Sequence, residues 1–210
     1  MESSENKYIR EHSSAAPEAL EWIEKQTHIR TNYPRMLSGP VQGRFLKMLV
    51  EISGAKRILE IGSFTGYSSC WMALGLPEGG YLDALEINDE LEDLMREGWQ
   101  RAGGEDRIRL HIGDALESLS TLEGPYDLIF VDANKRQYSE YYRLCLPLLR
   151  KGGLLVADDT LWDGKVYANP PSHDAQTKGL LEFNGIVASD PAVETVILPL
   201  KDGLTVIRKK

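Results

Sequence analysis

Cysteine is scarce in this chain of 210 residues, which contains only Cys70 and Cys145. Two cysteines cannot build the disulfide framework that holds many small secreted domains together. Each lies in a helical pattern, so we interpret both as small buried apolar residues of a reducing compartment. Residues 1–14 also lack the apolar core of a secretory signal, and the cytoplasm is therefore the expected location.

Positive charge is in deficit as well, because the formal net charge is −8 and the only basic cluster is the tail 208–210. A protein that binds nucleic acid through a basic face is not expected to have this balance. No apolar run approaches the roughly 20 residues of a membrane-spanning helix. The histidines are scattered without the spacing of a zinc site. The sequence thus predicts partners that are neither nucleic acid nor membrane.

Apolar residues make up 42% of the chain, enough for the core of one globular domain over residues 1–210. Short apolar runs alternate with amphipathic helical patterns. This alternation predicts an α/β fold with a doubly wound, mostly parallel sheet and helices on both faces. Expected strands are 57–61, 81–87, 108–112, 126–131 and 153–157, and expected helices between and after them are 67–76, 89–102, 138–149 and 174–188.

The two ends of the chain add to this alternation. Residues 1–53 are predicted to be a helical segment before the sheet, with one helix after Pro17, a loop over 30–40 and a second helix over 41–52. A loop through Pro170-Pro171 precedes the last expected helix. Strands over 193–200 and 204–209 flank Asp202-Gly203, which predicts a closing antiparallel hairpin.

The stretch 57–68 carries the first chemical signal, since a strand runs into a turn with Gly62 and Gly66 and then into a helix. This order is typical of the first crossover of a nucleotide-binding sheet. The spacing G-x-x-x-G differs from the dinucleotide pattern G-x-G-x-x-G, which argues against a dinucleotide-dependent oxidoreductase but leaves it as an alternative. Glu60, two residues before Gly62, instead matches the pattern of class I methyltransferases that bind S-adenosylmethionine.

An acid stands at or just past the end of each of the first five expected strands: Glu60, Glu86, Asp114, Asp132 and Asp158. Ligands of such sheets bind beyond the carboxyl ends of the strands. Glu86 follows Gly66 by 20 residues, the place of an acid that accepts from both ribose hydroxyls. Asp114 could accept from an adenine amine beside an apolar wall at Ile87, and Glu60 could face the donor's amino group or sulfonium. Each acid alone is more often a helix cap or a solvated loop residue, but the set favours a nucleoside ligand.

Asp132, Asp158 and Asp159 form a second group, at the ends of two strands expected to be adjacent. Carboxylates at neighbouring strand ends repel one another unless a cation lies between them. Ligand sets made of oxygen select a hard divalent ion such as Mg²⁺, Ca²⁺ or Mn²⁺. Lys135, three residues after Asp132, would lie near the same strand ends. The commoner role for such a residue is a surface lysine at the start of a helix.

Several stretches in this order along the chain resemble the metal-dependent O-methyltransferases of the caffeoyl-CoA and catechol type. They are Leu59–Ser68, Gly113–Leu116, Phe130–Lys135, Asp158–Trp162 and Asp202–Thr205. The resemblance implies a seven-stranded methyltransferase sheet, S-adenosylmethionine as the methyl donor and a homodimer. It also implies that Asp132, Asp158 and Asp159 hold the metal, with Lys135 and Asp132 as the catalytic pair beside the reacting hydroxyl.

The same resemblance implies a set of residues that contact the methyl donor. They are Met36, Ser38, Glu60, Gly62, Ser68, Glu86, Ile87, Asp114, Ala115 and Asp132. Two positions depart from the family pattern. Asp159 stands where the family usually has Asn, which adds a carboxylate to the metal site, and Asn134 stands where many plant relatives have Asp.

The expected reaction is methyl transfer to one hydroxyl of a vicinal aromatic diol. The metal would bind both adjacent oxygens and lower the pKa of the attacking one. Lys135 would take the proton or stabilise the phenolate. A binding protein that holds the donor without turnover is a second alternative. Residues 30–38 and 162–173 match no acceptor-specific pattern, so the natural acceptor stays open.

Overall fold

All seven strands of the protein join one sheet in the order β3-β2-β1-β4-β5-β7-β6, in a computed structural model that describes residues 4–169 and 173–210. The neighbours from β3 to β5 pair in parallel, whereas β7 runs antiparallel to both β5 and β6. The mostly parallel sheet with its closing hairpin is therefore confirmed. The strands are β1 (Arg57–Ile61), β2 (Tyr81–Glu86), β3 (Ile108–Ile112), β4 (Tyr126–Val131), β5 (Leu149–Ala157), β6 (Val193–Leu198) and β7 (Leu204–Lys209).

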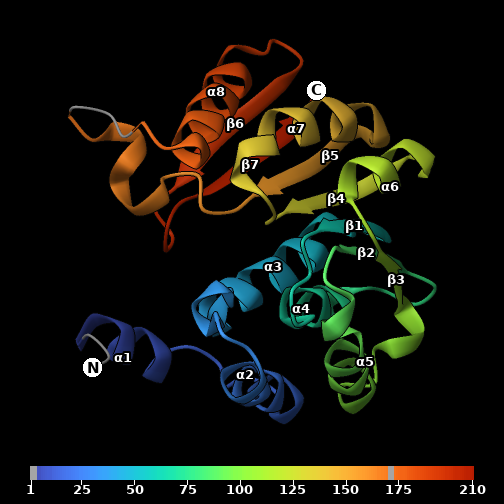
Figure 1. The fold of residues 1–210 in the computed structure, drawn as a ribbon. Coiled ribbons are helices and arrows are strands. Elements are labelled where there is room, and N and C mark those ends of the chain that lie inside the picture. Colours follow the sequence, from blue (N-terminus) through green and yellow to red (C-terminus); the bar gives the residue numbers. More distant parts are fainter. Residues whose placement is uncertain (1–3, 170–172) are drawn as a thin grey trace.

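Helices cover both faces of this sheet, as Figure 1 shows. Successive strand residues alternate between two cores: Ile58 packs with the helices α2 to α5, and Leu59 packs with α6 to α8. No helix among the described residues is both long and apolar enough to cross a membrane. The helices are α1 (Ser4–Glu11), α2 (Glu18–Arg30), α3 (Gly39–Ser53), α4 (Tyr67–Gly75), α5 (Glu92–Arg101), α6 (Ala115–Thr121), α7 (Tyr138–Leu148) and α8 (Ala175–Ser189).

Several element boundaries differ from the sequence prediction. The predicted loop over 30–40 contains a short 3-10 turn, η1 (Pro34–Met36), and α3 already begins at Gly39. Pro40 is tolerated there because the first helical turn does not need its missing N–H. Strand β5 begins at Leu149 rather than at residue 153, α6 was not predicted, and α1 was covered only by the general prediction of a helical segment over 1–53. The loop predicted at Pro170-Pro171 lies outside the described residues.

Helices α3 and α4 pack closely beneath β1. Gly43 of α3 faces Trp71 of α4, and a Cβ atom at this glycine would collide with the indole ring. Cys70 of α4 and Cys145 of α7 are buried and unbridged, which confirms their prediction as small apolar core residues. This packing fixes α3, whose first turn lies near the carboxyl ends of the central strands.

Candidate active site

Glu60, the next-to-last residue of β1, is a fully buried carboxylate. One of its oxygens accepts hydrogen bonds from Ser63 Oγ at 2.8 Å and from Ser69 Oγ. Its other oxygen, Oε1, is buried and has no partner among the described residues. Burial raises the pKa of Glu60 to about 7, while the nearby hydroxyls of Ser68, Ser69 and Ser63 oppose the rise. An orphaned acceptor in this place fits a ligand that brings its own N–H or positive charge.

The turn after β1 lets two strand ends approach one another. Gly62 has a φ of 89°, a conformation that side chains other than glycine's rarely adopt. A Cβ atom there would collide with the backbone carbonyl of Asp132, at the end of β4. Gly66 also has a positive φ, and Trp99 Nε1 donates to its carbonyl at 2.9 Å. The glycine turn thus brings the end of β1, which carries the proposed donor residue Glu60, close to the end of β4, which carries Asp132.

Glu86 and Asp114 follow on the next two strands. Glu86 is buried, and its two oxygens accept from the backbone N–H groups of Phe64 at 2.6 Å and Asn88 at 2.9 Å. These two bonds fix the carboxylate against the glycine turn. Asp114 caps α6 by accepting from the N–H groups of residues 116 and 117, the role that is commonest for a single acid. Ile87 is 71% exposed, so an apolar surface is available beside Glu86.

The remaining predicted donor contacts differ in exposure. Met36 at the end of η1 is 59% exposed, whereas Ser38, just before α3, is buried. Ser68 is buried in the first turn of α4, and Ala115 is half-buried in the first turn of α6. Met36 and Ser38 therefore lie before the first strand of the sheet. Ser68 follows the carboxyl end of β1, and Ala115 follows the carboxyl end of β3.

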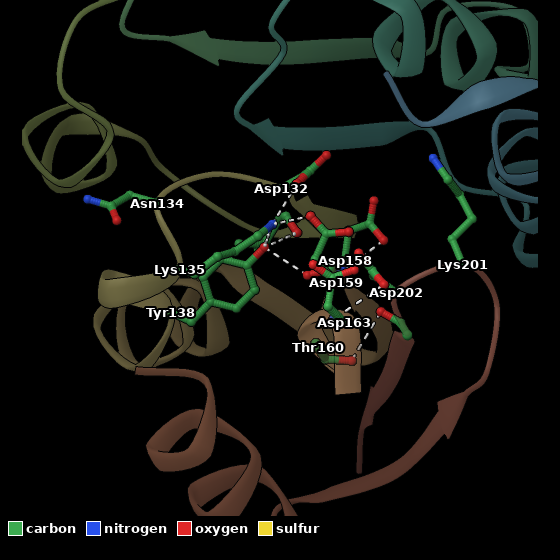
Figure 2. Close-up of polar contacts among 12 residues, drawn as sticks. Asp132, Asn134, Lys135, Tyr138, Asp158, Asp159, Thr160, Asp163, Lys201 and Asp202 are labelled. Carbon is green, nitrogen blue, oxygen red and sulfur yellow. Dashed lines mark hydrogen bonds and ion pairs between the residues drawn. The ribbon is translucent and has the colours of Figure 1, made fainter. Parts of the chain in front are cut away.

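Asp132, Asp158 and Asp159 come together where β4 and β5 end side by side (Figure 2). Each offers one carboxylate oxygen, and these oxygens all lie within 4.8 Å of one another. Burial and the charges of Asp132 and Asp159 together raise the pKa of Asp158 to about 7, against the opposing charge of Lys135. Burial likewise raises the pKa of Asp132, against the opposing charge of Lys135. Three acidic oxygens held this close fit a hard divalent cation.

Lys135 is buried against these carboxylates, so its interpretation as a surface lysine is wrong. Its Nζ atom lies 2.7 Å from Asp132 Oδ1 and 3.0 Å from Asp159 Oδ2. It also donates to the Tyr138 hydroxyl at 2.7 Å. Burial alone would lower the pKa of Lys135, but the carboxylates raise it well above its usual value. The side chain is therefore an ammonium ion in this arrangement.

Two residues of the site were missed in the sequence. Gln42 of α3 is fully buried, and its Nε2 donates to Asp158 Oδ2 at 2.5 Å. The Tyr138 hydroxyl, which accepts from Lys135, donates to the carbonyl of Asp158 at 2.9 Å. Gln42 had a usable signal, since it shares the buried face of α3 with Leu46 and Val50. A glutamine on an apolar helix face needs a buried polar partner.

The family profile described as "O-methyltransferase" matches residues 10–210. The chain belongs to this O-methyltransferase family. The O-methyltransferase is 37% identical over 217 residues to a caffeoyl-CoA O-methyltransferase of Eucalyptus gunnii, a match that covers 96% of this chain and 86% of that protein. It is also 37% identical over 171 residues to a catechol O-methyltransferase of Niastella koreensis, covering 80% of this chain and 77% of that one.

A solved structure gives the same result for the fold. The O-methyltransferase TomG of Streptomyces achromogenes, in complex with SAM, superimposes with a TM-score of 0.91 at 31% identity and covers 99% of this chain and 96% of its own. The protein is thus an S-adenosylmethionine-dependent O-methyltransferase of the caffeoyl-CoA and catechol type. Its family membership rules out the dinucleotide-dependent oxidoreductase.

Proposed function

We propose that this O-methyltransferase transfers a methyl group from S-adenosylmethionine to one hydroxyl of a vicinal aromatic diol, with the aid of a divalent cation. The observation that carries the proposal is the cluster of Asp132, Asp158 and Asp159 with the buried Lys135 between two of them. Relatives named for caffeoyl-CoA and catechol support a phenolic acceptor.

The three aspartates would hold Mg²⁺, Ca²⁺ or Mn²⁺ through carboxylate oxygens. When bound, such a cation supplies positive charge that lowers the pKa of an oxygen beside it. Gln42 and the N–H of Asp159 each donate to a different oxygen of Asp158, so this carboxylate is held in one orientation. Carboxylates fixed in this way need little reorganisation when they bind an ion.

Lys135 would act on the acceptor as a charged hydrogen-bond donor. Its raised pKa keeps it protonated, so it suits stabilisation of a phenolate better than removal of a proton. Tyr138 accepts from Lys135 and donates to a backbone carbonyl, which orients the ammonium toward Asp132. Asp132 would thus serve both catalysis and metal binding.

The donor would lie along the carboxyl ends of β1, β2 and β3. Glu86 would accept from the ribose hydroxyls, and the orphaned Oε1 of Glu60 would face the donor's amino group or sulfonium. Apolar surface at Ile87 would face the adenine ring. The full donor set is the predicted one: Met36, Ser38, Glu60, Gly62, Ser68, Glu86, Ile87, Asp114, Ala115 and Asp132. We further propose that residues 1–210 act as one methyltransferase domain in a cytoplasmic homodimer, as the family resemblance implies.

The test is methyl transfer from labelled S-adenosylmethionine to a panel of hydroxylated aromatics. Vicinal diols should be methylated with Mg²⁺ present, and activity should vanish in EDTA and return with Mg²⁺, Mn²⁺ or Ca²⁺. Monophenols with the same ring serve as matched acceptors that lack the second oxygen. Full activity in chelator would refute the metal, and donor binding without transfer to any acceptor would favour the binding-protein alternative.

A further inference from the structure

The turn between β6 and β7 contains a residue in an unfavourable backbone conformation. Lys201 has a φ of 50°, in the left-handed region that residues with a side chain seldom occupy. Residues held in such a conformation persist where surrounding contacts determine it, and they cluster at functional sites.

The Lys201 side chain reaches across to the segment before α3. Its Nζ atom donates to the carbonyl of Leu37 at 3.0 Å and to the carbonyl of Ser38 at 2.8 Å. These residues are more than 160 positions away in the sequence, and they link η1 to α3. Met36 and Ser38 in the same segment belong to the proposed donor site. A charged donor shared by two neighbouring carbonyls fixes the orientation of that backbone.

The other side of the same turn holds the segment after Asp159. The carbonyl of Asp202 accepts from Leu161 N at 2.7 Å, and the carbonyl of Gly203 accepts from Thr160 N at 2.9 Å. A Cβ atom on Gly203 would collide with Leu161, so the two segments are in close contact. Figure 2 shows Lys201 extending from this turn on the opposite side of the aspartates from Lys135.

We propose that Lys201 is a positioning residue for the methyl donor. It holds the backbone of Leu37 and Ser38 at a fixed place relative to the segment that carries Asp159. The turn is anchored on the Asp159 side by backbone hydrogen bonds, which do not depend on the Lys201 side chain. Loss of the ammonium therefore releases only the donor side. The inference rests on the proposed donor site, and it adds a residue whose ammonium donates to backbone carbonyls rather than to the aspartates.

The experiment compares the full-length wild type with Lys201→Met, Lys201→Arg and the control Lys151→Met. Lys151 is an exposed lysine near the start of β5, at the end of the strand away from Asp158. Calorimetry gives the Kd for S-adenosylmethionine, and initial rates with a catechol acceptor and Mg²⁺ give KM for the donor and kcat. Thermal melts and Mg²⁺ titrations are measured on the same samples.

Lys201→Met should raise Kd and KM for S-adenosylmethionine about tenfold, the order expected when charge-assisted hydrogen bonds are lost. Its kcat at saturating donor and its affinity for Mg²⁺ should stay near those of the wild type, and its melting temperature should fall by only a few degrees, as expected for the loss of two hydrogen bonds. Lys201→Arg should restore most of the donor affinity because a guanidinium can also donate to two carbonyls. Lys151→Met should behave as wild type.

Unchanged donor affinity in Lys201→Met would overturn the inference, provided that the wild type binds S-adenosylmethionine. An equal loss of Mg²⁺ affinity would also overturn it, because the whole site would then have been disturbed. A Glu86→Ala variant tests the donor site itself. If this variant binds S-adenosylmethionine as tightly as the wild type, the result counts against the proposed donor site instead.

Discussion

Glu60 is a buried acid whose ionisation we expect to be linked to binding of the methyl donor. Burial raises the pKa of its carboxyl from 4.5 to about 7. The protonated carboxyl therefore contributes stability that is fully present below pH 4.5 and is lost as the pH rises through about 7. A donor group with positive charge beside Oε1 favours the ionised form, and donor binding should then release a proton below that pH.

The affinity for S-adenosylmethionine should accordingly increase as the pH is raised from about 6 to about 8, by at most about tenfold per pH unit for one proton. Glu60→Gln keeps the shape of the side chain but cannot ionise, so its donor affinity should be weaker at high pH and nearly independent of pH. Calorimetry across this range, in buffers of different ionisation enthalpy, measures both the affinity and the proton released. A flat affinity profile for the wild type would show that Glu60 does not face a charged part of the donor.

Lys135 lies between two carboxylates and is predicted to act on the acceptor oxygen. Lys135→Ala should lower kcat by roughly 10²–10³-fold at neutral pH, the usual cost of removing one fixed donor to a developing oxyanion. The loss should shrink as the pH rises, because free phenolate then forms without help from the lysine. Donor affinity should change little. The measurement is kcat against pH at saturating Mg²⁺ and donor, and coincident curves for the two proteins would remove Lys135 from catalysis.

The close packing of helices α3 and α4 depends on the absence of a Cβ atom at Gly43. Gly43 lies in the interior of α3 against the Trp71 ring, whereas Gly185 lies in the interior of α8 with open space around it. Both are helical glycines, so alanine would favour the helix at each position by roughly 0.5–1 kcal/mol. Only at Gly43 would the added methyl group force Trp71 out of its place.

Gly43→Ala should therefore destabilise the protein by about 1–3 kcal/mol, the usual cost of overpacking, and Gly185→Ala should stabilise it slightly. Urea denaturation followed by tryptophan fluorescence and by circular dichroism would give both values. Since α3 also carries Gln42, the Gly43→Ala variant should lose activity before it unfolds. Equal stabilisation by both substitutions would mean that α3 and α4 can move apart without cost.

The elements also show what could be predicted from the sequence. Strands β1 to β4 were placed almost to the residue, because apolar runs bounded by glycine and acids leave few alternatives. Helix α6 has only seven residues and one buried side chain, Leu119, so the apolar pattern does not repeat often enough to indicate a helix. The strand-end acids were found by position alone. The burial of Lys135 and its contacts with Asp132 and Asp159 could not be predicted, because they depend on how closely β4 and β5 end beside one another.

At the scale of the whole molecule, the aspartate cluster works against stability in the absence of a cation. Asp132, Asp158 and Asp159 meet at one edge of the sheet, and Lys135 neutralises only part of their charge. An ion that binds the folded protein alone stabilises it by about 2.7 kcal/mol at a concentration of 100 times Kd. Stability should therefore depend on divalent ions even when no substrate is present.

Saturating Mg²⁺ should raise the melting temperature by roughly 5–10 °C over EDTA, the shift expected for that energy in a protein of this size. Asp158→Ala should abolish the shift and the methyl-transfer activity while it still binds S-adenosylmethionine. Differential scanning fluorimetry with and without donor separates the two effects. The same shift in Asp158→Ala as in the wild type would place the ion elsewhere.

Strand β7 is the last of the seven strands along the chain, yet it lies inside the sheet between β5 and β6. A ribosome-bound chain that ends before residue 203 would display two unpaired strand edges, which are templates for aggregation. It would also lack Gly203, which together with Asp202 anchors the segment after Asp159. Chaperone demand during synthesis should consequently peak just before β7 emerges. A fusion that delays the pairing of β7 should lower the yield of soluble protein, although the folded enzyme itself is unchanged.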